Sequence, residues 1–296
     1  MTALPWGQRY LMCPPKYFEV LYEINPWMHR EIVADPARAA DQWDRLVATL
    51  REAGADVELQ APVEGWPDLV FTANAGIVNG RQFVPARFRH PQRQGETPYD
   101  IEWFAANGFV VDELPLGVSQ EGAGDALPFG DVLVCAYRFR SDATSHAYLS
   151  RLTGAAVRSI ELVDERLYHF DLTFCPLDDR RAIVAPLGWD RYGAKVMEAL
   201  VPEPLVLEAE EALAFVANSV VVGTTVVMPA CPPRVGRQLE EWGFDVVVCP
   251  VEEFVKAGGG CRCLTLALDV TLGPLGRAHP PAVASPPSRR GGEEGA

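Results

Sequence analysis

The sequence is poor in positive charge. It contains 26 lysine and arginine residues against 40 aspartate and glutamate residues, so its formal net charge is −14. Nucleic-acid binding needs clustered lysine and arginine side chains that neutralise phosphate groups. The composition therefore argues against a nucleic-acid partner, and the partner that we expect is a small-molecule substrate.

Long hydrophobic runs are also missing. The longest apolar stretch, from Leu213 to Val227, is interrupted by polar residues and a glycine, so it predicts a β-hairpin instead of a membrane span. The first ten residues lack the basic start and the apolar stretch of a signal peptide. We expect no membrane partner and a cytoplasmic location.

A cysteine spacing typical of disulfide bonds is absent as well. The chain has seven cysteines, an odd number without a disulfide framework, which is typical of a reducing compartment. Cys261 and Cys263 are spaced too closely for the usual Cys-x2-Cys metal motif, and no second Cys/His pair stands at a suitable distance. We expect no metal site.

What the sequence does contain is a repeated pattern of two β-rich runs, a helical stretch and a further β-rich run. In its clearest copy a first strand begins at Val216, the chain turns at Thr224-Thr225, a helix covers about 234–242, and a last strand begins at Phe244. Similar units begin near Asp68, Glu121, His169 and Cys263.

The N-terminus supplies the missing part of the last unit. Residues 9–13 can pair with 263–270, and a helix is predicted from Asp35, as N-cap, to Gly54. Repeats of roughly 45 to 55 residues indicate a solenoid or propeller, and exchange between the termini favours a closed ring. We predict an α/β fold of five ββαβ units with pseudo-five-fold symmetry in residues 1–271, and a disordered tail in 272–296.

Polar residues recur near the predicted start of the first strand in each unit. They are Asp68 with Asn74, Glu121 with Asp125, His169 with Asp171, Asn218, and Cys263. Because five strand starts converge on the axis of a ring, carboxylates, an imidazole and a thiol would meet there. This convergence predicts a catalytic site.

Cys263 is the candidate nucleophile. It follows three glycines, which let the backbone approach a ligand closely. A free thiol has a pKa of about 8.5, so the thiolate needs a cationic neighbour or substrate. A buried structural cysteine is the alternative interpretation.

His169 is the candidate proton carrier. Asp171 follows two residues later, so on a strand both side chains would face the same way, and the carboxylate would orient the ring and raise its pKa. A core histidine is the alternative. Glu121 could equally belong to a bulge around Ala123 that Asp125 caps.

Five arginines flank the second strands of two units: Arg87, Arg89, Arg93, Arg138 and Arg140. Most are expected to be solvated. Arg93 and Arg140 are the candidates for binding a substrate carboxylate, because guanidinium groups bind carboxylates through two parallel hydrogen bonds.

Together these segments resemble the guanidino-group modifying superfamily of arginine deiminases, dimethylarginine dimethylaminohydrolases, agmatine deiminases and amidinotransferases. The matching segments are 67–76, 121–125, 169–171, 227–230 and 258–265. The resemblance implies a five-bladed α/β propeller (the pentein fold) and no metal or organic cofactor.

It also implies roles for individual residues. Cys263 would attack the guanidinium carbon, and His169 would protonate the departing amine and then activate water. Glu121 would bind guanidinium nitrogens, while Arg93 and Arg140 would hold the substrate α-carboxylate. The further substrate-binding candidates are Asn25, Asp68, Phe71, Asp171 and Asn218.

One position departs from the deiminase pattern. After Val-Phe, where deiminases and dimethylarginine hydrolases place an acidic residue, this chain has Phe71-Thr-Ala-Asn74. With Asn25 in the segment 22–28, this is most similar to the arginine dihydrolase branch, whose members convert arginine to ornithine, carbon dioxide and two ammonia. In cyanobacteria that branch forms the N-terminal part of a longer bifunctional protein, and here we expect a stand-alone version.

Other functions stay open at this point. They are dimethylarginine dimethylaminohydrolase, a deiminase that gives citrulline, an amidinotransferase, and a non-catalytic propeller that binds an amino acid. An Asn74 amide offers both donors and an acceptor, so it could hold a cationic guanidinium or a neutral ureido group. A homo-oligomer is possible, and the sequence does not set its size.

Overall fold

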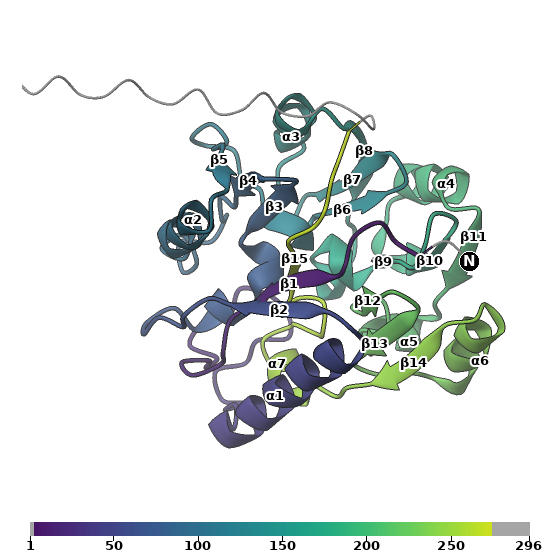
Figure 1. Ribbon diagram of the computed structural model, residues 1–296, viewed down its shortest axis with the longest axis horizontal. Coiled ribbons are helices and arrows are strands. Elements are labelled where there is room, and N and C mark those ends of the chain that lie inside the picture. The colour runs from purple at the N-terminus through teal and green to yellow at the C-terminus, as the bar shows by residue number, and fades with distance from the viewer. Residues whose placement is uncertain (1–2, 274–296) are drawn as a thin grey trace, which may run out of the picture.

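The computed structural model describes residues 3–273, and within this range five three-stranded sheets form the framework of a mixed α/β fold (Figure 1). The predicted tail lies, from residue 274 onward, outside the described residues. In every sheet the first two strands are antiparallel and the third is parallel to the second. A helix connects the second and third strands, as a parallel connection requires. In Figure 1 these connecting helices lie at the periphery.

The strands, grouped by sheet, are β3 (Gly76–Asn79), β4 (Gln82–Pro85) and β5 (Val110–Val111); β6 (Ala126–Phe129), β7 (Val132–Tyr137) and β8 (Ala156–Glu161); β9 (Phe174–Pro176), β10 (Arg181–Val184) and β11 (Glu203–Val206); β12 (Val220–Val222), β13 (Thr225–Met228) and β14 (Asp245–Val248); and β15 (Leu266–Ala267), β1 (Arg9–Met12) and β2 (Asp56–Leu59). The connecting helices, in the same order, are α2 (Thr97–Ala106), α3 (Ser145–Thr153), α4 (Arg191–Leu200), α6 (Pro233–Glu241) and α1 (Pro36–Glu52). Two short helices, α5 (Ala209–Leu213) and α7 (Glu252–Val255), follow β11 and β14.

The predicted pairing between the two ends of the chain is confirmed. β1 lies between β15 and β2, with Tyr10 opposite Ala267 and Val57. Helix α1 begins where predicted, because the Asp35 carboxylate accepts hydrogen bonds from the backbone N–H groups of Ala37 and Arg38. No helix in residues 3–273 has the length and hydropathy needed to cross a membrane.

The predicted start of the first strands is wrong by a few residues. In place of a strand start, a tight turn precedes each first strand, and in it a backbone N–H bonds to the C=O three residues earlier. The pairs are Asn74 to Phe71, Asp125 to Gly122, Thr173 to Phe170, Asn218 to Phe215, and Thr265 to Arg262, at 2.9 to 3.2 Å. Because these groups bond locally, they cannot join a strand ladder, so the polar residues lie on turns.

The hairpin in the apolar stretch 213–227 is present, with different ends. β12 begins at Val220 instead of Val216, because residues 214–217 form a turn in which Phe215 has a φ of +58°. Val222 pairs with Thr225, so the connection is Gly223-Thr224.

Candidate active site

A small cavity lies beside two of these turns, the ones that carry Asn74 and Cys263. It is lined by Asn25, Met28, Asp68, Phe71, Asn74, Arg93, Arg140, Tyr168, Ala257, Gly259 and Cys263. The other four expected site residues, Glu121, His169, Asp171 and Asn218, contact a lining residue directly or through Glu121. The free volume of about 10 Å³ is close to the space that one water molecule needs.

Cys263 lies on the last of these turns and is held by two polar neighbours. Its sulfur accepts a hydrogen bond from the Asn218 amide at 3.2 Å, and its thiol donates to the Asp171 carboxylate at 3.4 Å. The Asn218 carbonyl oxygen accepts the backbone N–H groups of Arg262 and Cys263. Burial raises the pKa of Cys263, and the Asp171 charge raises it further, so the resting group is a neutral thiol.

The turn separates the two neighbouring cysteines, which a strand would have placed on one face. The Cys261 thiol points into the hydrophobic core and donates to the carbonyl of Cys249 at 3.3 Å. Only Cys263 of the pair lines the cavity. The structure therefore supplies the geometric distinction that the sequence lacked.

The three glycines before Cys261 are required by close contacts. A Cβ atom on Gly259 would lie 2.3 Å from the Phe71 ring, and one on Gly260 would lie 2.6 Å from the Asn218 side-chain oxygen. Gly258 has a φ of +83°, a left-handed conformation that favours glycine. The glycine run thus lets the Cys263 segment pack against two other turns.

His169 does not pair with Asp171 as predicted. Its Nε2 atom lies 2.9 Å from the Glu121 carboxylate, whereas Asp171 faces Cys263. The prediction assumed a strand, but residues 170–172 form a turn, so neighbouring side chains do not alternate. Burial lowers the pKa of His169 to about 4, although the Glu121 hydrogen bond partly opposes this shift. The imidazole is therefore neutral at rest near neutral pH.

Glu121 is fully buried between two cationic or polar partners. Its Oε2 atom accepts from Arg140 Nη1 at 2.9 Å as well as facing His169, and its Oε1 atom accepts the backbone N–H of Arg89. Burial alone would raise the Glu121 pKa, but Arg140 and the His169 hydrogen bond outweigh it and lower the pKa below its usual range. In this structure the carboxylate orients the imidazole.

Asp125 makes hydrogen bonds beyond its own turn, whereas it was predicted only to cap a bulge. The segment around Ala123 is a 3-10 turn, and the Asp125 carboxylate accepts from the Ser141 hydroxyl at 2.6 Å and from the backbone N–H of Phe170 at 3.2 Å. The second contact braces the turn that carries His169. Sequence spacing gave no signal for this bond between turns.

Asn74 is held at both ends of its amide. The side-chain oxygen accepts from Arg93 Nη1 at 2.8 Å, and the side-chain nitrogen donates to the backbone oxygen of Glu121 at 3.2 Å. A Cβ atom on residue 124 would lie 2.3 Å from this nitrogen, so Gly124 makes room for the amide.

The two arginines expected to bind a carboxylate are both buried, 3% exposed in each case. Arg93 pairs with Glu96, a partner that the sequence reading missed although the spacing of three residues was visible. Arg140 also donates to the backbone oxygen of Ile24, and its guanidinium carbon lies 4.6 Å from the centre of the Tyr168 ring. Tyr168 is another residue that the sequence reading missed.

Asn25, Asp68 and Phe71 complete the cavity wall. The Asn25 amide donates to the backbone oxygen of Ala257 and accepts the backbone N–H of Trp27. Within residues 3–273 the buried Asp68 Oδ1 atom makes no hydrogen bond of standard geometry. Burial raises the pKa of this carboxyl, while Arg93 and the nearby Tyr22 hydroxyl oppose the shift. Asp68 is therefore a lining carboxyl that can accept a further hydrogen bond.

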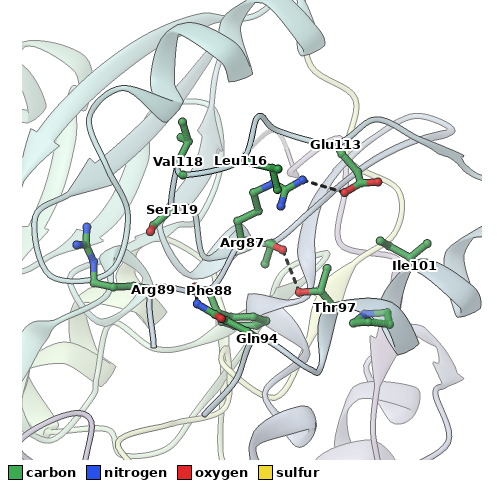
Figure 2. A pocket seen from close by; sticks show the side chains of 13 residues that line it. Arg87, Phe88, Arg89, Gln94, Thr97, Ile101, Glu113, Leu116, Val118 and Ser119 are labelled. Atoms are coloured by element: carbon green, nitrogen blue, oxygen red, sulfur yellow. Dashed lines mark hydrogen bonds and ion pairs between the residues drawn. The ribbon is translucent and has the colours of Figure 1, made fainter. Parts of the chain in front are cut away.

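A larger open cleft of about 490 Å³ lies beside this site (Figure 2). Two of its arginines are already paired, Arg87 with Glu113 and Arg89 with Asp142. None of the expected catalytic side chains lines it. The small cavity around Cys263 is therefore the candidate active site in spite of the size of the cleft.

No family model matches the chain. It is 44% identical over 263 residues to the bifunctional arginine dihydrolase/ornithine cyclodeaminase ArgZ of Synechocystis sp., an alignment that covers 87% of this chain and 37% of that protein. It is 36% identical over 264 residues to the N(G),N(G)-dimethylarginine dimethylaminohydrolase of Mycobacterium tuberculosis, covering 89% of this chain and 87% of that protein. The chain thus spans about a third of the length of the bifunctional relatives and nearly the full length of the mycobacterial one.

Solved structures agree with these relationships. The N-terminal domain of cyanobacterial ArgZ bound to product superposes with a TM-score of 0.87 at 42% identity, covering 90% of this chain and 99% of that one. A dimethylarginine dimethylaminohydrolase adduct with 4-chloro-2-hydroxymethylpyridine, at 20% identity and a TM-score of 0.73, covers 88% of this chain and 99% of that one and shares the fold.

These relationships define the class of protein first: the chain is similar to hydrolases that act on C–N bonds of linear amidines. Within that class, the chain belongs to the guanidino-group modifying superfamily, in its arginine dihydrolase branch.

Proposed function

We propose that the chain is an arginine dihydrolase that converts arginine to ornithine, carbon dioxide and two ammonia through a covalent intermediate on Cys263. The observation that carries the proposal is Asn74, an amide at the position where the deiminase pattern has an acid, beside a buried thiol. The similarity to the arginine dihydrolases ArgZ and AgrE supports it. We also propose that the five sheets form the blades of one closed propeller with pseudo-five-fold symmetry, since each turn region is hydrogen-bonded to the next around a ring. The bonded pairs are Ala73 with Cys263, Asn74 with Glu121, Asp125 with Phe170, Asp171 with Asn218, and Asn218 with Arg262.

The first hydrolysis begins with attack of the Cys263 sulfur on the guanidinium carbon. An arriving guanidinium cation favours the thiolate, and the thiol proton passes to the neutral His169 imidazole. Loss of ammonia, with that proton, leaves a thiouronium group on Cys263. Water then adds, activated by His169, and the C–S bond breaks to leave a ureido group.

The second hydrolysis repeats the attack on the ureido carbon. Ammonia leaves again, and Cys263 carries a thiocarbamate whose C–S bond is broken by a second water. The carbamate that is released breaks down to ornithine and carbon dioxide. Each hydrolysis consumes one water and releases one ammonia, so the atoms balance.

The buried charges suit the two ends of arginine. Arg140, and Arg93 through the second N–H of its Nη1 atom, can each donate one hydrogen bond to the α-carboxylate, and Asp68 can bind the α-ammonium. Asp171 accepts from the Cys263 thiol, so it would lie beside the guanidinium group that this thiol attacks. Because the cavity is far smaller than arginine, some lining groups must move when the substrate binds.

Asn74 accounts for the second step. Its oxygen accepts from Arg93 and one of its N–H groups donates to the Glu121 backbone oxygen. Since Asn74 lines the cavity, we propose that the second N–H is available to the substrate. An N–H can donate to the oxygen of a neutral ureido group, whereas a carboxylate would repel that oxygen and be poorly compensated after desolvation. The amide would hold the ureido intermediate near Cys263 until the second attack.

A second candidate is dimethylarginine dimethylaminohydrolase, which the mycobacterial relative favours. A deiminase that releases citrulline shares the same first step, an amidinotransferase is a weaker alternative, and a non-catalytic propeller would leave Cys263 inert. Cytoplasmic location, a catalytic propeller domain in 1–271, the absence of cofactors and a homo-oligomeric state remain predictions.

Product analysis distinguishes these functions. The protein is incubated separately with arginine and with N(G),N(G)-dimethylarginine, and ornithine is resolved from citrulline. We expect ornithine from arginine and little turnover of the methylated substrate. Citrulline together with dimethylamine from the methylated substrate would establish the second candidate. A slow alkylation rate of Cys263 that arginine does not change would support the non-catalytic one.

A further inference from the structure

We propose that Glu96 is a positioning residue for the second hydrolysis, because it locks Arg93 in the one orientation that fixes the Asn74 amide. The proposal rests on the arginine dihydrolase function proposed above. Glu96 does not line the cavity, so it would act only through Arg93 and Asn74.

The planar guanidinium group of Arg93 is fixed by hydrogen bonds along one edge. Its Nε atom donates to Glu96 Oε1 at 2.9 Å, and its Nη2 atom donates to Glu96 Oε2 at 2.7 Å and to the backbone oxygen of Asp68 at 3.0 Å. The Phe88 ring lies against it, with the guanidinium carbon 4.4 Å from the ring centre. Paired hydrogen bonds to a carboxylate fix the plane of a guanidinium.

The opposite edge of Arg93 faces Asn74. With Nε and Nη2 engaged, Nη1 remains and donates to the Asn74 side-chain oxygen at 2.8 Å. A flipped amide would place its own N–H groups against this donor, which is unfavourable. Arg93 therefore sets which end of the Asn74 amide faces the Glu121 backbone oxygen and the cavity.

The local structure directs the Glu96 side chain toward Arg93. Glu96 occupies the N-cap position of α2, yet its side chain makes no capping hydrogen bond to the helix and is 1% exposed. Its backbone N–H bonds to the Arg93 oxygen, so both residues share one turn. Gly95 lets that turn pack on Trp66, since a Cβ atom there would lie 2.0 Å from the indole ring.

Loosening Arg93 would change how the ureido intermediate divides between the second attack and release as citrulline. If Arg93 is loosened, the Asn74 amide can rotate and lose the N–H that holds the ureido oxygen. The intermediate then leaves as citrulline before the second attack. The effect falls on product ratio, which does not depend on how much enzyme is folded and active.

The experiment compares citrulline released per arginine consumed in wild type, Glu96→Gln and Glu96→Asp, at saturating arginine. Glu96→Gln keeps the side-chain size but removes the charge, and it should raise the citrulline fraction at least about tenfold, the order expected for loss of one charge-assisted hydrogen bond. Glu96→Asp keeps the charge on a shorter side chain and should give an intermediate fraction. It also serves as the test if Glu96→Gln fails to fold.

Asp100→Asn is the matched control. Asp100 is another buried carboxyl nearby, but its hydrogen bond goes to Gln60 and not to Arg93, so the citrulline fraction should stay at the wild-type value. A wild type that forms only ornithine together with Glu96 variants that also form only ornithine would overturn the inference and leave the proposed function standing. A wild type whose main product is citrulline would overturn the proposed function, and the inference with it.

Discussion

At the scale of single residues, chemistry in this site depends on which turn carries a side chain. Cys261 and Cys263 are two residues apart, yet one thiol packs in the core and the other faces Asp171 and Asn218. His169 and Asp171 are equally close in sequence and also contact different partners. Residue types at the site could be predicted from sequence, whereas their pairing depended on turns that the alternation rule does not describe.

The two cysteines give a direct comparison. Cys263→Ala removes the sulfur that lines the cavity, so turnover of arginine should be abolished. Cys261→Ala removes a core thiol whose hydrogen bond, within residues 3–273, goes to the Cys249 carbonyl, so it should keep most of the activity and lose some stability. Steady-state rates of the two purified variants decide the matter, and the reverse pattern would show that the nucleophile is Cys261.

The acid limb of the pH profile should reveal His169. Burial lowers its pKa to about 4, so the imidazole stays neutral and able to accept the thiol proton until the pH falls through that value, where kcat/KM should drop. His169→Ala should lose this limb together with ~10²–10⁴-fold in rate.

A second group complicates the same profile, because burial raises the pKa of Asp171 to about 7. As the pH falls through that value, Asp171 loses its charge and its attraction for a guanidinium, so a limb near 7 should disappear in Asp171→Asn. For the His169 prediction above, near-normal activity in His169→Ala would rule out the proton-carrier role.

At the scale of elements, long amphipathic segments were predictable and short ones were not. Helix α1 could be located from Asp35, Pro36 and one apolar face, because several local signals agree there. The turns before the first strands could not, since their sequences are rich in β-formers such as Val70 and Phe71 and the hydrogen bonds that favour a turn are set by packing against other turns.

The cap of α1 offers a test of this local account. Asp35→Ala removes a carboxylate that accepts two backbone N–H groups and should lower the free energy of unfolding by about 0.5–2 kcal/mol. Asp41→Ala, an exposed aspartate within the same helix, is the control and should change it little. Urea unfolding followed by circular dichroism measures both, and equal effects would contradict the assigned N-cap.

At the scale of the whole molecule, one sheet combines residues from both ends of the described chain. Leu11 lies in its central strand, is fully buried, and stands opposite Leu266. Leu11→Ala should therefore destabilise the entire described fold by about 2–5 kcal/mol and lower the unfolding midpoint seen by fluorescence and by circular dichroism together.

Leu116→Ala is the matched control, because that leucine is 86% exposed and its loss should cost little. Two separate transitions in the Leu11 variant would indicate that the sheet joining the ends unfolds alone, which the closed-ring proposal does not allow.

The central claim is that Asn74 commits the ureido intermediate to a second hydrolysis, and the ammonia released per arginine consumed tests it most directly. The wild type should release about two ammonia, because an amide donor can hold the neutral ureido oxygen. Asn74→Asp should fall toward one, with citrulline replacing ornithine, since a carboxylate would face both that oxygen and the Glu121 carbonyl. A wild type that releases only one ammonia and accumulates citrulline would contradict the account.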